Sequence, residues 1–415
     1  MSENIKYLLY ILKCIVCKEN LSKSAKKIDW ETIFAAAGAG EVLTILYKKV
    51  QELPLEQQPD TEKMDWLKKL SIQIGIRKLQ SYDLLEQVLQ EAKKQKIKLM
   101  ILKGPILSAL YPEPLLRNSC DIDLYVEEEN HTDMENLLDK MHFKKNLKHS
   151  KKTVPVYEYN SILTLEVHYR LYEEYAGERV ECLESMDLPE EESRVTVNVC
   201  GVVMETLGYE QHLIFLIFHL AKHISYNGCT LKNMLDIVLY INAYEKKIDK
   251  QDFWKKMEAL KYTTFCRILF CIGCYYFGMT KNIFLGEGYS EDIARTMLQQ
   301  FYDIGILKTN LGEWEKERRA SSIVFQSISV GQNKKISKRK IWLKTLFPSS
   351  RDLSFRYMYA RRYPIFIWIA WIHRAIHQCN LYFVRHNKAF SVAMDVKRAK
   401  QKITFLKELD LVQKE

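Results

Sequence analysis

Three acidic residues on two short apolar runs have the spacing of a metal site. Asp121 and Asp123 begin one run, DIDLYV, which ends at Val126. Side chains alternate between the two faces of a β-strand, so both aspartates point the same way. Two carboxylates this close repel one another unless a cation or solvent separates them. Mg²⁺ suits the site, because it binds through one or two carboxylates and substrate phosphates. The alternative is that this tripeptide is only the polar beginning of a strand.

A second run, residues 163–169 with the sequence LTLEVHY, supplies the third acid. Glu166 and His168 share one face of this predicted strand, and Leu165 and Val167 share the other face, toward the core. A buried glutamate is costly unless it is paired or bound to a metal. If the two strands are neighbours, Glu166 completes a cluster suited to two-metal phosphoryl or nucleotidyl transfer. Glu158 is a rival for this position, but the neighbours of Glu166 are more apolar.

The elements that must position these acids start with the apolar run at residues 99–102. It stops at Lys103-Gly104, which predicts a short buried strand followed by a turn. Pro105 suits the first position of a helix, whose N-terminal amides can bind an anion. In this turn Lys103 can neutralise the charge on phosphates, and Gly104 lets the backbone approach them.

Arg117 lies between this turn and the acids in the sequence. It can neutralise phosphate charge together with Lys103, or it can anchor its loop by pairing with Glu113. The sequence leaves the two roles equally open.

Taken together, these residues resemble a known family. The order Lys103-Gly104, Arg117, Asp121-x-Asp123 and Glu166-x-His168, followed by a helix with His219 and His223, is similar to the uncharacterised nucleotidyltransferase family of the polymerase-beta-like superfamily. The resemblance covers residues 98–240 well and the C-terminal part loosely. It implies a mixed sheet with flanking helices and Mg²⁺ (or Mn²⁺) on the three carboxylates.

The activity that this resemblance implies is transfer of a nucleoside monophosphate from a nucleoside triphosphate, such as ATP. Nucleotide binding is then assigned to Lys103, Gly104, Arg117 and His168. The superfamily usually has Gly-Ser in the turn before the carboxylates, where this chain has Lys103-Gly104-Pro105. A catalytically inactive nucleotide-binding or assembly protein of the same fold is therefore the alternative function.

A predicted helix at residues 210–225 carries several histidines. His219 and His223 are four apart and lie on one face. Asp236, on the next helix, could meet them in a metal site. Because no glutamate separates the histidines as in H-E-x-x-H, a pocket wall or a buried polar cluster is the preferred role. The resemblance adds weight to a place on the substrate side for all three residues.

Composition bounds the class of protein and its partners. The chain has 415 residues, 47% hydrophobic and 27% charged, which is typical of a soluble globular protein. Its net charge of +10 favours anionic ligands without requiring nucleic acid. We interpret the basic run at 331–340 as a solvated loop. Since no basic and aromatic stripe is visible, a small molecule or a protein is favoured over nucleic acid as the acceptor.

Cysteine usage and hydropathy indicate the compartment. The ten cysteines follow no secretory signal, which predicts reduced thiols and a cytoplasmic protein. The apolar run at residues 365–372 is too short to span a bilayer. We expect it to be a buried helix. A peripheral membrane contact through this aromatic helix is the alternative.

The predicted fold class is α+β, with a nucleotidyltransferase-type mixed sheet, flanking helices, N-terminal helices and a mostly helical C-terminal region. Four regions follow. They are an N-terminal helical region at 1–97, a catalytic domain at 98–208, a helical domain at 209–330 and a basic, aromatic helical region at 331–415. The segment at 173–192 reads as an acidic loop.

Overall fold

The computed structural model describes most of the chain, in two compact units. The described residues are 1–24, 27–119, 121–147, 150, 153–172, 178–185, 193–226, 228–280, 288–307, 347, 350, 353, 357–384 and 392–412. The first unit comprises residues 1–224, 228–314 and 409–411, and the second comprises 225–227, 315–408 and 412–415. The division into four regions that was made from the sequence stays a prediction.

Helices precede the sheet, as predicted for residues 1–97. They are α1 (Glu3–Cys17), α2 (Trp30–Ala39), α3 (Leu46–Val50), the 3₁₀ turn η1 (Leu55–Gln57) and the long α4 (Thr61–Lys94). The Asp60 side chain caps α4 by accepting a hydrogen bond from the Lys63 amide. The apolar side of α4 packs on the sheet through Tyr82, Leu85 and Val88.

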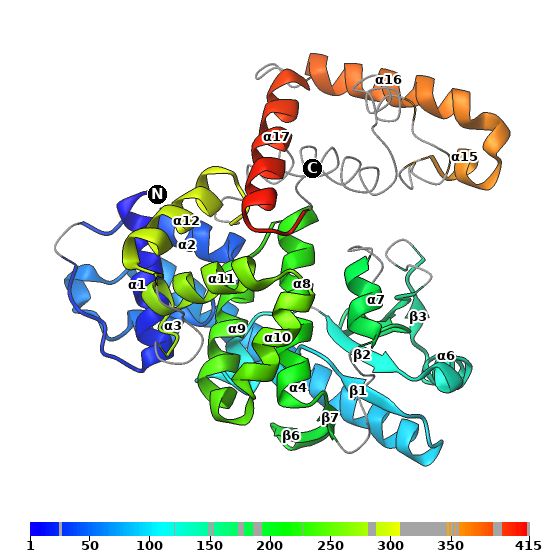
Figure 1. The fold of residues 1–415 in the computed structure, drawn as a ribbon, viewed down its shortest axis with the longest axis horizontal. Helices are drawn as coiled ribbons and strands as arrows, with labels where there is room; N and C mark the ends of the chain where they lie inside the picture. The colour runs from blue at the N-terminus through cyan, green and yellow to red at the C-terminus, as the bar shows by residue number, and fades with distance from the viewer. Residues whose placement is uncertain are drawn as a thin grey trace. The chain divides into compact units, whose positions relative to one another are not determined.

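The first unit contains a five-stranded mixed sheet, which lies to the lower right in Figure 1. Its strands are β1 (Leu99–Ile101), β2 (Ile122–Val126), β3 (Lys144–Lys145), β4 (Val156–Tyr159) and β5 (Leu163–His168), in the order β1-β2-β5-β4-β3. The β2–β5 pair is parallel, and the other pairs are antiparallel. The two strands that carry Asp123 and Glu166 are therefore neighbours, which was the condition for a shared site.

Short elements connect these strands. They are α5 (Pro105–Ser108), η2 (Pro114–Leu116), η3 (Glu128–Asn130) and α6 (His131–Lys140). Asn130 stands at the N-terminus of α6, but its side chain accepts from the Lys98 amide instead of capping the helix. Helix α5 is a single turn that begins at proline, so it has few free amides to offer an anion.

One face of the sheet is apolar and the other carries the acids. Ile122, Leu124 and Val126 of β2 are buried in the same core as Leu165 and Val167 of β5. Helix α6 adds Met134, Leu137 and Leu138 to this core. Strict alternation along both strands therefore sends their polar side chains to the opposite face.

After the sheet the chain forms a helix and a hairpin. Helix α7 (Glu178–Ser185) lies in the segment at 173–192, so the expectation of a loop there is wrong for these residues. The rest of that segment lies outside the described residues. The hairpin consists of β6 (Val195–Val199) and β7 (Val202–Thr206), and its apolar residues join the core of the sheet.

Helices complete the first unit. They are α8 (Tyr209–Tyr226), α9 (Leu231–Tyr244), η5 (Glu245–Lys247), α10 (Lys250–Ala259), α11 (Thr263–Tyr276) and α12 (Glu291–Asp303). Helix α12 returns to the N-terminal helices, where the Met1 amino group donates to Gln299 at 2.8 Å (Figure 1). The predicted helical continuation after the catalytic sheet is confirmed.

The second unit is described through α15 (Met358–Arg362), η8 (Pro364–Phe366), α16 (Ile367–Val384) and α17 (Val392–Glu408). Leu353, Tyr357, Ala360 and Ala370 form its small core. The expectation that residues 365–372 form a buried helix is wrong, since Ile365 is 77% exposed and Ile372 is 53% exposed. Among the described residues, no helix has the length and apolar character needed to cross a bilayer. The basic run at 331–340 lies outside the described residues.

Candidate active site

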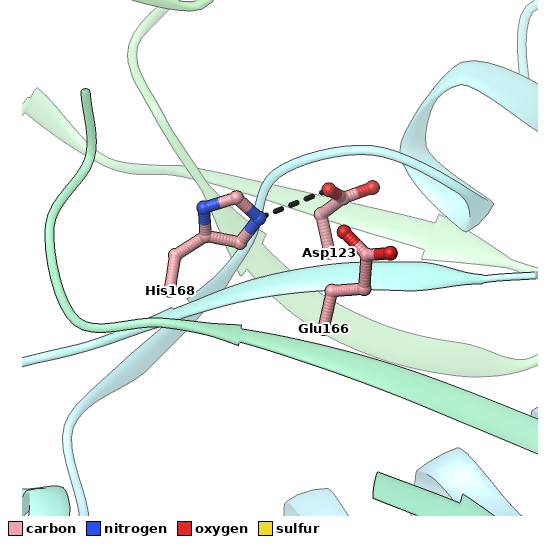
Figure 2. Close-up of side chains that lie close together, drawn as sticks. All are labelled: Asp123, Glu166 and His168. Carbon is pink, nitrogen blue, oxygen red and sulfur yellow. Dashed lines mark hydrogen bonds and ion pairs between the residues drawn. The ribbon is translucent and has the colours of Figure 1, made fainter. Parts of the chain in front are cut away.

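Asp123, Glu166 and His168 meet on the polar face of the sheet (Figure 2). Asp123 of β2 and Glu166 of β5 are direct partners in the parallel register, and His168 lies two residues further along β5. One ligand atom from each residue lies within 4.8 Å of the other two. His168 donates from Nε2 to Asp123 Oδ1 at 3.0 Å. The structure thus brings together two of the three carboxylates considered from the sequence, with His168 beside them; their role as a shared site stays a prediction.

Burial sets the charge states of the two carboxylates. Burial alone would raise the pKa of Asp123, but the Lys103 ammonium and His168 hold that pKa well below its usual value. Glu166 experiences the opposite effect. Burial, with repulsion from Asp123 and Asp121, raises the pKa of Glu166 to about 7. The face therefore holds one firmly ionised carboxylate beside another that exchanges a proton near neutral pH.

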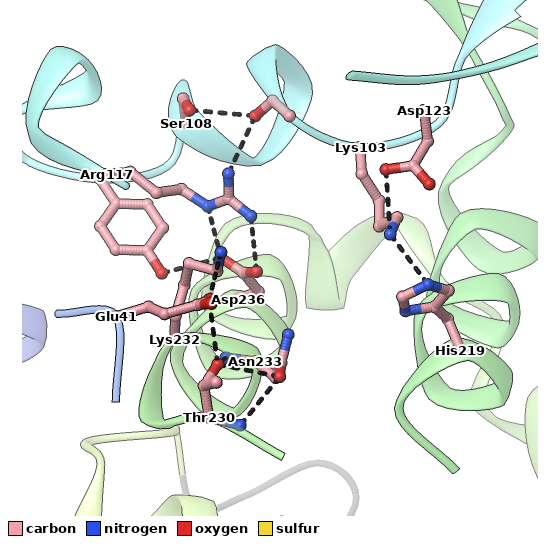
Figure 3. A network of polar contacts seen from close by, with 12 residues as sticks. Glu41, Lys103, Ser108, Arg117, Asp123, His219, Thr230, Lys232, Asn233 and Asp236 are labelled. Atoms are coloured by element: carbon pink, nitrogen blue, oxygen red, sulfur yellow. Dashed lines mark hydrogen bonds and ion pairs between the residues drawn. The ribbon is translucent and has the colours of Figure 1, made fainter. Parts of the chain in front are cut away.

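Lys103 supplies the positive charge at this face. Its ammonium lies 3.0 Å from Asp123 Oδ2 and donates to His219 Nε2 at 2.9 Å (Figure 3). Burial would lower the pKa of Lys103, but Asp123, Asp121 and Glu166 raise it above its usual value. The turn before α5 directs the side chain here, and Gly104 adopts φ +67° in that turn. This backbone conformation favours glycine.

The residues present fit a divalent cation. Two carboxylates and an imidazole are an oxygen and nitrogen donor set that such cations accept. The pKa of Glu166 shows that a second negative charge is unfavourable at this face without a further cation. His168 Nδ1 is buried and has no hydrogen-bond partner within the described part of the chain, and it lies on the other side of the ring from the Nε2 that faces Asp123 (Figure 2).

Asp121 lies at the edge of this cluster. It precedes β2 and is half-buried, and its carboxylate is not among the three close ligand atoms. Its charge still raises the pKa of both Glu166 and Lys103. The assignment of Asp121 as a metal ligand stays a prediction.

Arg117 is placed away from the carboxylates, in a buried ion pair (Figure 3). Its Nε and Nη2 donate to both oxygens of Asp236 on α9, at 2.8 and 2.7 Å, and Tyr111 donates to Asp236 Oδ1 at 2.8 Å. Burial alone would raise the pKa of Asp236, but the guanidinium lowers it. The alternative pairing of Arg117 with Glu113 is wrong, because Glu113 pairs with Lys48 at the surface.

The two histidines of α8 are separated from Asp236. His219 and His223 have ring centroids 4.4 Å apart. Burial and the nearby Lys103 lower the pKa of His219 well below its usual value, so the neutral ring accepts from the ammonium. Asp236 is instead occupied by Arg117 and Tyr111, and these three residues do not form a metal cluster in the described structure. The polar-cluster role preferred from the sequence fits this geometry.

Sequence reasoning missed two buried polar residues near the site. Lys78 of α4 donates to Ser108 Oγ at 3.1 Å and to the Arg117 carbonyl oxygen. His212 of α8 donates from Nε2 to the Leu102 carbonyl oxygen at 2.6 Å, just before the lysine turn. A lysine in a charged helix gives no signal of burial. Its helical spacing from Tyr82 and Leu85 was the only signal that could have revealed it.

A comparison of the sequence with models of protein families shows which family the chain belongs to. The model for a family described as uncharacterised nucleotidyltransferases matches residues 26–277. The chain belongs to that family. The matched range contains every site residue considered above, and it confirms the resemblance found in the sequence. This nucleotidyltransferase has no match among curated proteins.

Two solved structures show weak similarity to this nucleotidyltransferase. One is the antibiotic-resistance factor ANT(2'')-Ia, with 14% identity, a TM-score of 0.32, and coverage of 45% of this chain and 91% of that chain. The other is an antigenic nucleotidyltransferase-like protein from Paracoccidioides brasiliensis, with 16% identity, a TM-score of 0.29, and coverage of 44% of this chain and 87% of that chain.

Proposed function

We propose that this nucleotidyltransferase moves a nucleoside monophosphate from a nucleoside triphosphate to a hydroxyl of a small molecule or a protein, with Mg²⁺ or Mn²⁺. The observation that carries the proposal is the register pairing of Asp123 and Glu166 on parallel strands, with buried His168 beside them. Family membership supplies the reaction type. The metal, the donor and the acceptor belong to the proposal.

Asp123, Glu166 and Asp121 would hold the cation, with His168 orienting Asp123. When bound, the cation neutralises charge on the phosphates of the donor. Asp123 suits this task because its low pKa keeps it ionised at any physiological pH. His168 fixes one oxygen of that carboxylate through its Nε2 hydrogen bond.

Glu166 would accept the proton of the attacking hydroxyl. Without a cation the pKa of Glu166 is raised to about 7, and a divalent cation at the same face would lower it, which leaves an ionised carboxylate able to accept a proton. In the balanced step, the hydroxyl oxygen bonds to the α-phosphorus as its proton passes to Glu166. The bond from that phosphorus to the bridging oxygen breaks, and pyrophosphate leaves with the electron pair.

Lys103 would face the phosphates of the donor, since it already lies at the carboxylates on a flexible stem. Gly104 permits the turn that brings it there. Arg117 would have a different task. Its guanidinium is held by Asp236, so it supports the turn through the Gly104 carbonyl at 3.4 Å instead of reaching phosphate.

The test is to incubate the purified protein with each labelled nucleoside triphosphate, Mg²⁺ or Mn²⁺ and a cell extract, then to seek a labelled product. Asp123→Asn and Asp121→Asn are each expected to lower transfer at least about a hundredfold, because charge stabilisation at the phosphates is lost. Glu158→Gln on β4 is the matched control, since that carboxylate accepts from Asn146 outside the cluster. Transfer that persists in Asp123→Asn would contradict the proposal.

A second candidate function is nucleotide binding without turnover. The Lys103–Asp123 ion pair favours it, because a lysine stands where the superfamily usually has Gly-Ser and its ammonium contacts a catalytic carboxylate. Metal-dependent binding of a nucleotide by calorimetry, with no labelled product from any extract, would identify this function.

A further inference from the structure

Both oxygens of Asp123 are already engaged in the protein alone. Oδ1 accepts from His168, and Oδ2 lies 3.0 Å from the Lys103 ammonium. Asp123 is 2% exposed, so its negative charge is stabilised by the Lys103 ammonium and not by solvent. A divalent cation that binds Asp123 and Glu166 must share this space with an ammonium of the same sign.

The ammonium also has a second acceptor within reach. Lys103 Nζ lies 2.9 Å from His219 Nε2, on α8, and its four-carbon stem rotates easily (Figure 3). The side chain can therefore leave Asp123 without losing all its hydrogen bonds.

We propose that Lys103 is a built-in counter-ion, which neutralises the carboxylate face of the free protein and is exchanged for a divalent cation. This inference rests on the proposed function, because it concerns the same site. It implies that the fold does not need metal and that Lys103 weakens metal binding until a nucleotide draws the ammonium onto its phosphates.

Mn²⁺ binding to the full chain without nucleotide, followed by electron paramagnetic resonance, tests the exchange. Lys103→Met and the more polar Lys103→Gln are expected to bind Mn²⁺ at least about tenfold more tightly than the unmodified protein. Lys103→Arg keeps the charge and is expected to bind within about threefold of it. In EDTA, Lys103→Met should melt at a lower temperature, and Mn²⁺ should restore the loss.

Unchanged or weaker Mn²⁺ affinity in both neutral variants would overturn the inference, because Lys103 would then be only a structural ion pair. Absence of Mn²⁺ binding in every variant would also overturn it. The exchange can hold while transfer fails, since tighter Mn²⁺ binding without any labelled product would refute only the proposed activity.

A separate observation concerns α16 in the second unit. Trp368, Ile372 and Ile376 of α16, with Ile365 of the preceding η8, are each more than half exposed and recur at helical spacing, so they form one apolar stripe. The opposite side of the helix packs through Ala370. The sequence from Leu353 to Met394 contains no acidic residue, and its basic residues are Arg356, Arg361, Arg362, Arg374, Arg385 and Lys388.

We infer that this stripe docks on an anionic lipid surface. An interfacial helix buries Trp and Ile among acyl chains while basic residues contact acidic headgroups. The charge pattern favours this partner over an apolar protein groove, since a stretch of 42 residues without a single carboxylate repels basic surfaces and attracts acidic ones.

Flotation of the full chain with vesicles tests this inference. The protein is expected to bind vesicles of three parts phosphatidylcholine to one part phosphatidylglycerol. Binding should be at least fivefold weaker with vesicles of phosphatidylcholine alone. In the double variant Ile372→Ser with Ile376→Ser, binding to the mixed vesicles should fall at least tenfold. Leu55→Ser, in the first unit and 85% exposed, is the control and should bind normally. Equal binding to both vesicles, or self-association through the stripe detected by light scattering, would overturn it.

Discussion

Replacing Glu166 with glutamine removes a carboxyl group whose pKa the fold raises. The native pKa of about 7 lies above the ordinary 4.5, so the folded protein binds a proton there that the unfolded chain releases. This contribution to stability is fully present below pH 4.5 and is lost as the pH rises through 7. The glutamine variant keeps the shape and does not titrate.

The size of the effect follows from the shift. A rise from 4.5 to about 7 corresponds to about 3 kcal/mol of unfolding free energy at most, at about 1.4 kcal/mol for each pH unit of the shift. We expect Glu166→Gln to be more stable than the unmodified protein by under about 1 kcal/mol at pH 5. At pH 8 the variant should be more stable by up to about 3 kcal/mol.

Urea unfolding in EDTA at pH 5, 6, 7 and 8 measures this difference. His212 and His219 have lowered pKa values, so they destabilise the fold as the pH falls below their ordinary value of 6.5. Both histidines are present in both proteins, and their effects cancel in the difference. Asp123 titrates below the window, since its pKa is lowered. A difference that stays constant from pH 5 to pH 8 would refute the electrostatic account of the site.

Two further predictions concern residues that support the site. Arg117→Met should cost about 3 to 5 kcal/mol of unfolding free energy, because it leaves the Asp236 charge buried without a partner, and adding Asp236→Leu should recover most of this loss. The control Lys48→Met breaks an exposed ion pair and should cost under about 1 kcal/mol. Equal losses for Arg117→Met and Lys48→Met in urea unfolding would contradict this prediction. Gly104→Ala should cost about 1 to 3 kcal/mol of unfolding free energy, because the φ of Gly104 is +67°. The control Gly38→Ala lies in a helix with open space around it and should not destabilise the protein. Equal melting temperatures for the two variants in calorimetry would contradict this prediction.

Local patterns predicted the elements that carry the site. Alternation of polar and apolar residues identified β2 and β5, and it placed Glu166 and His168 on one face of their strand. That this strand lies beside the strand of Asp123 was only a condition in the sequence argument, and the structure supplies it. The Lys103-Gly104-Pro105 turn was found from its proline and glycine. These features depend on the nearest few residues, which a single sequence displays in full.

Contacts between distant segments could not be predicted. Arg117 and Asp236 are 119 residues apart, and no local period links them. The same holds for Lys103 and His219, which are 116 residues apart. The burial of residues 365–372 was also misjudged, because hydropathy records the tendency of a side chain to avoid water and does not show whether another element covers it.

The guanidinium of Arg117 has a consequence for redesign of this protein. It contacts the Gly104 carbonyl oxygen on one side and the carboxylate of α9 on the other, so one side chain spans the donor turn and the helical half of the first unit. Substitutions in α9 that disturb Asp236 are therefore expected to shift the turn that carries Lys103 as well, although no residue of α9 belongs to that turn. Any redesign of α9 will need compensating changes around Gly104.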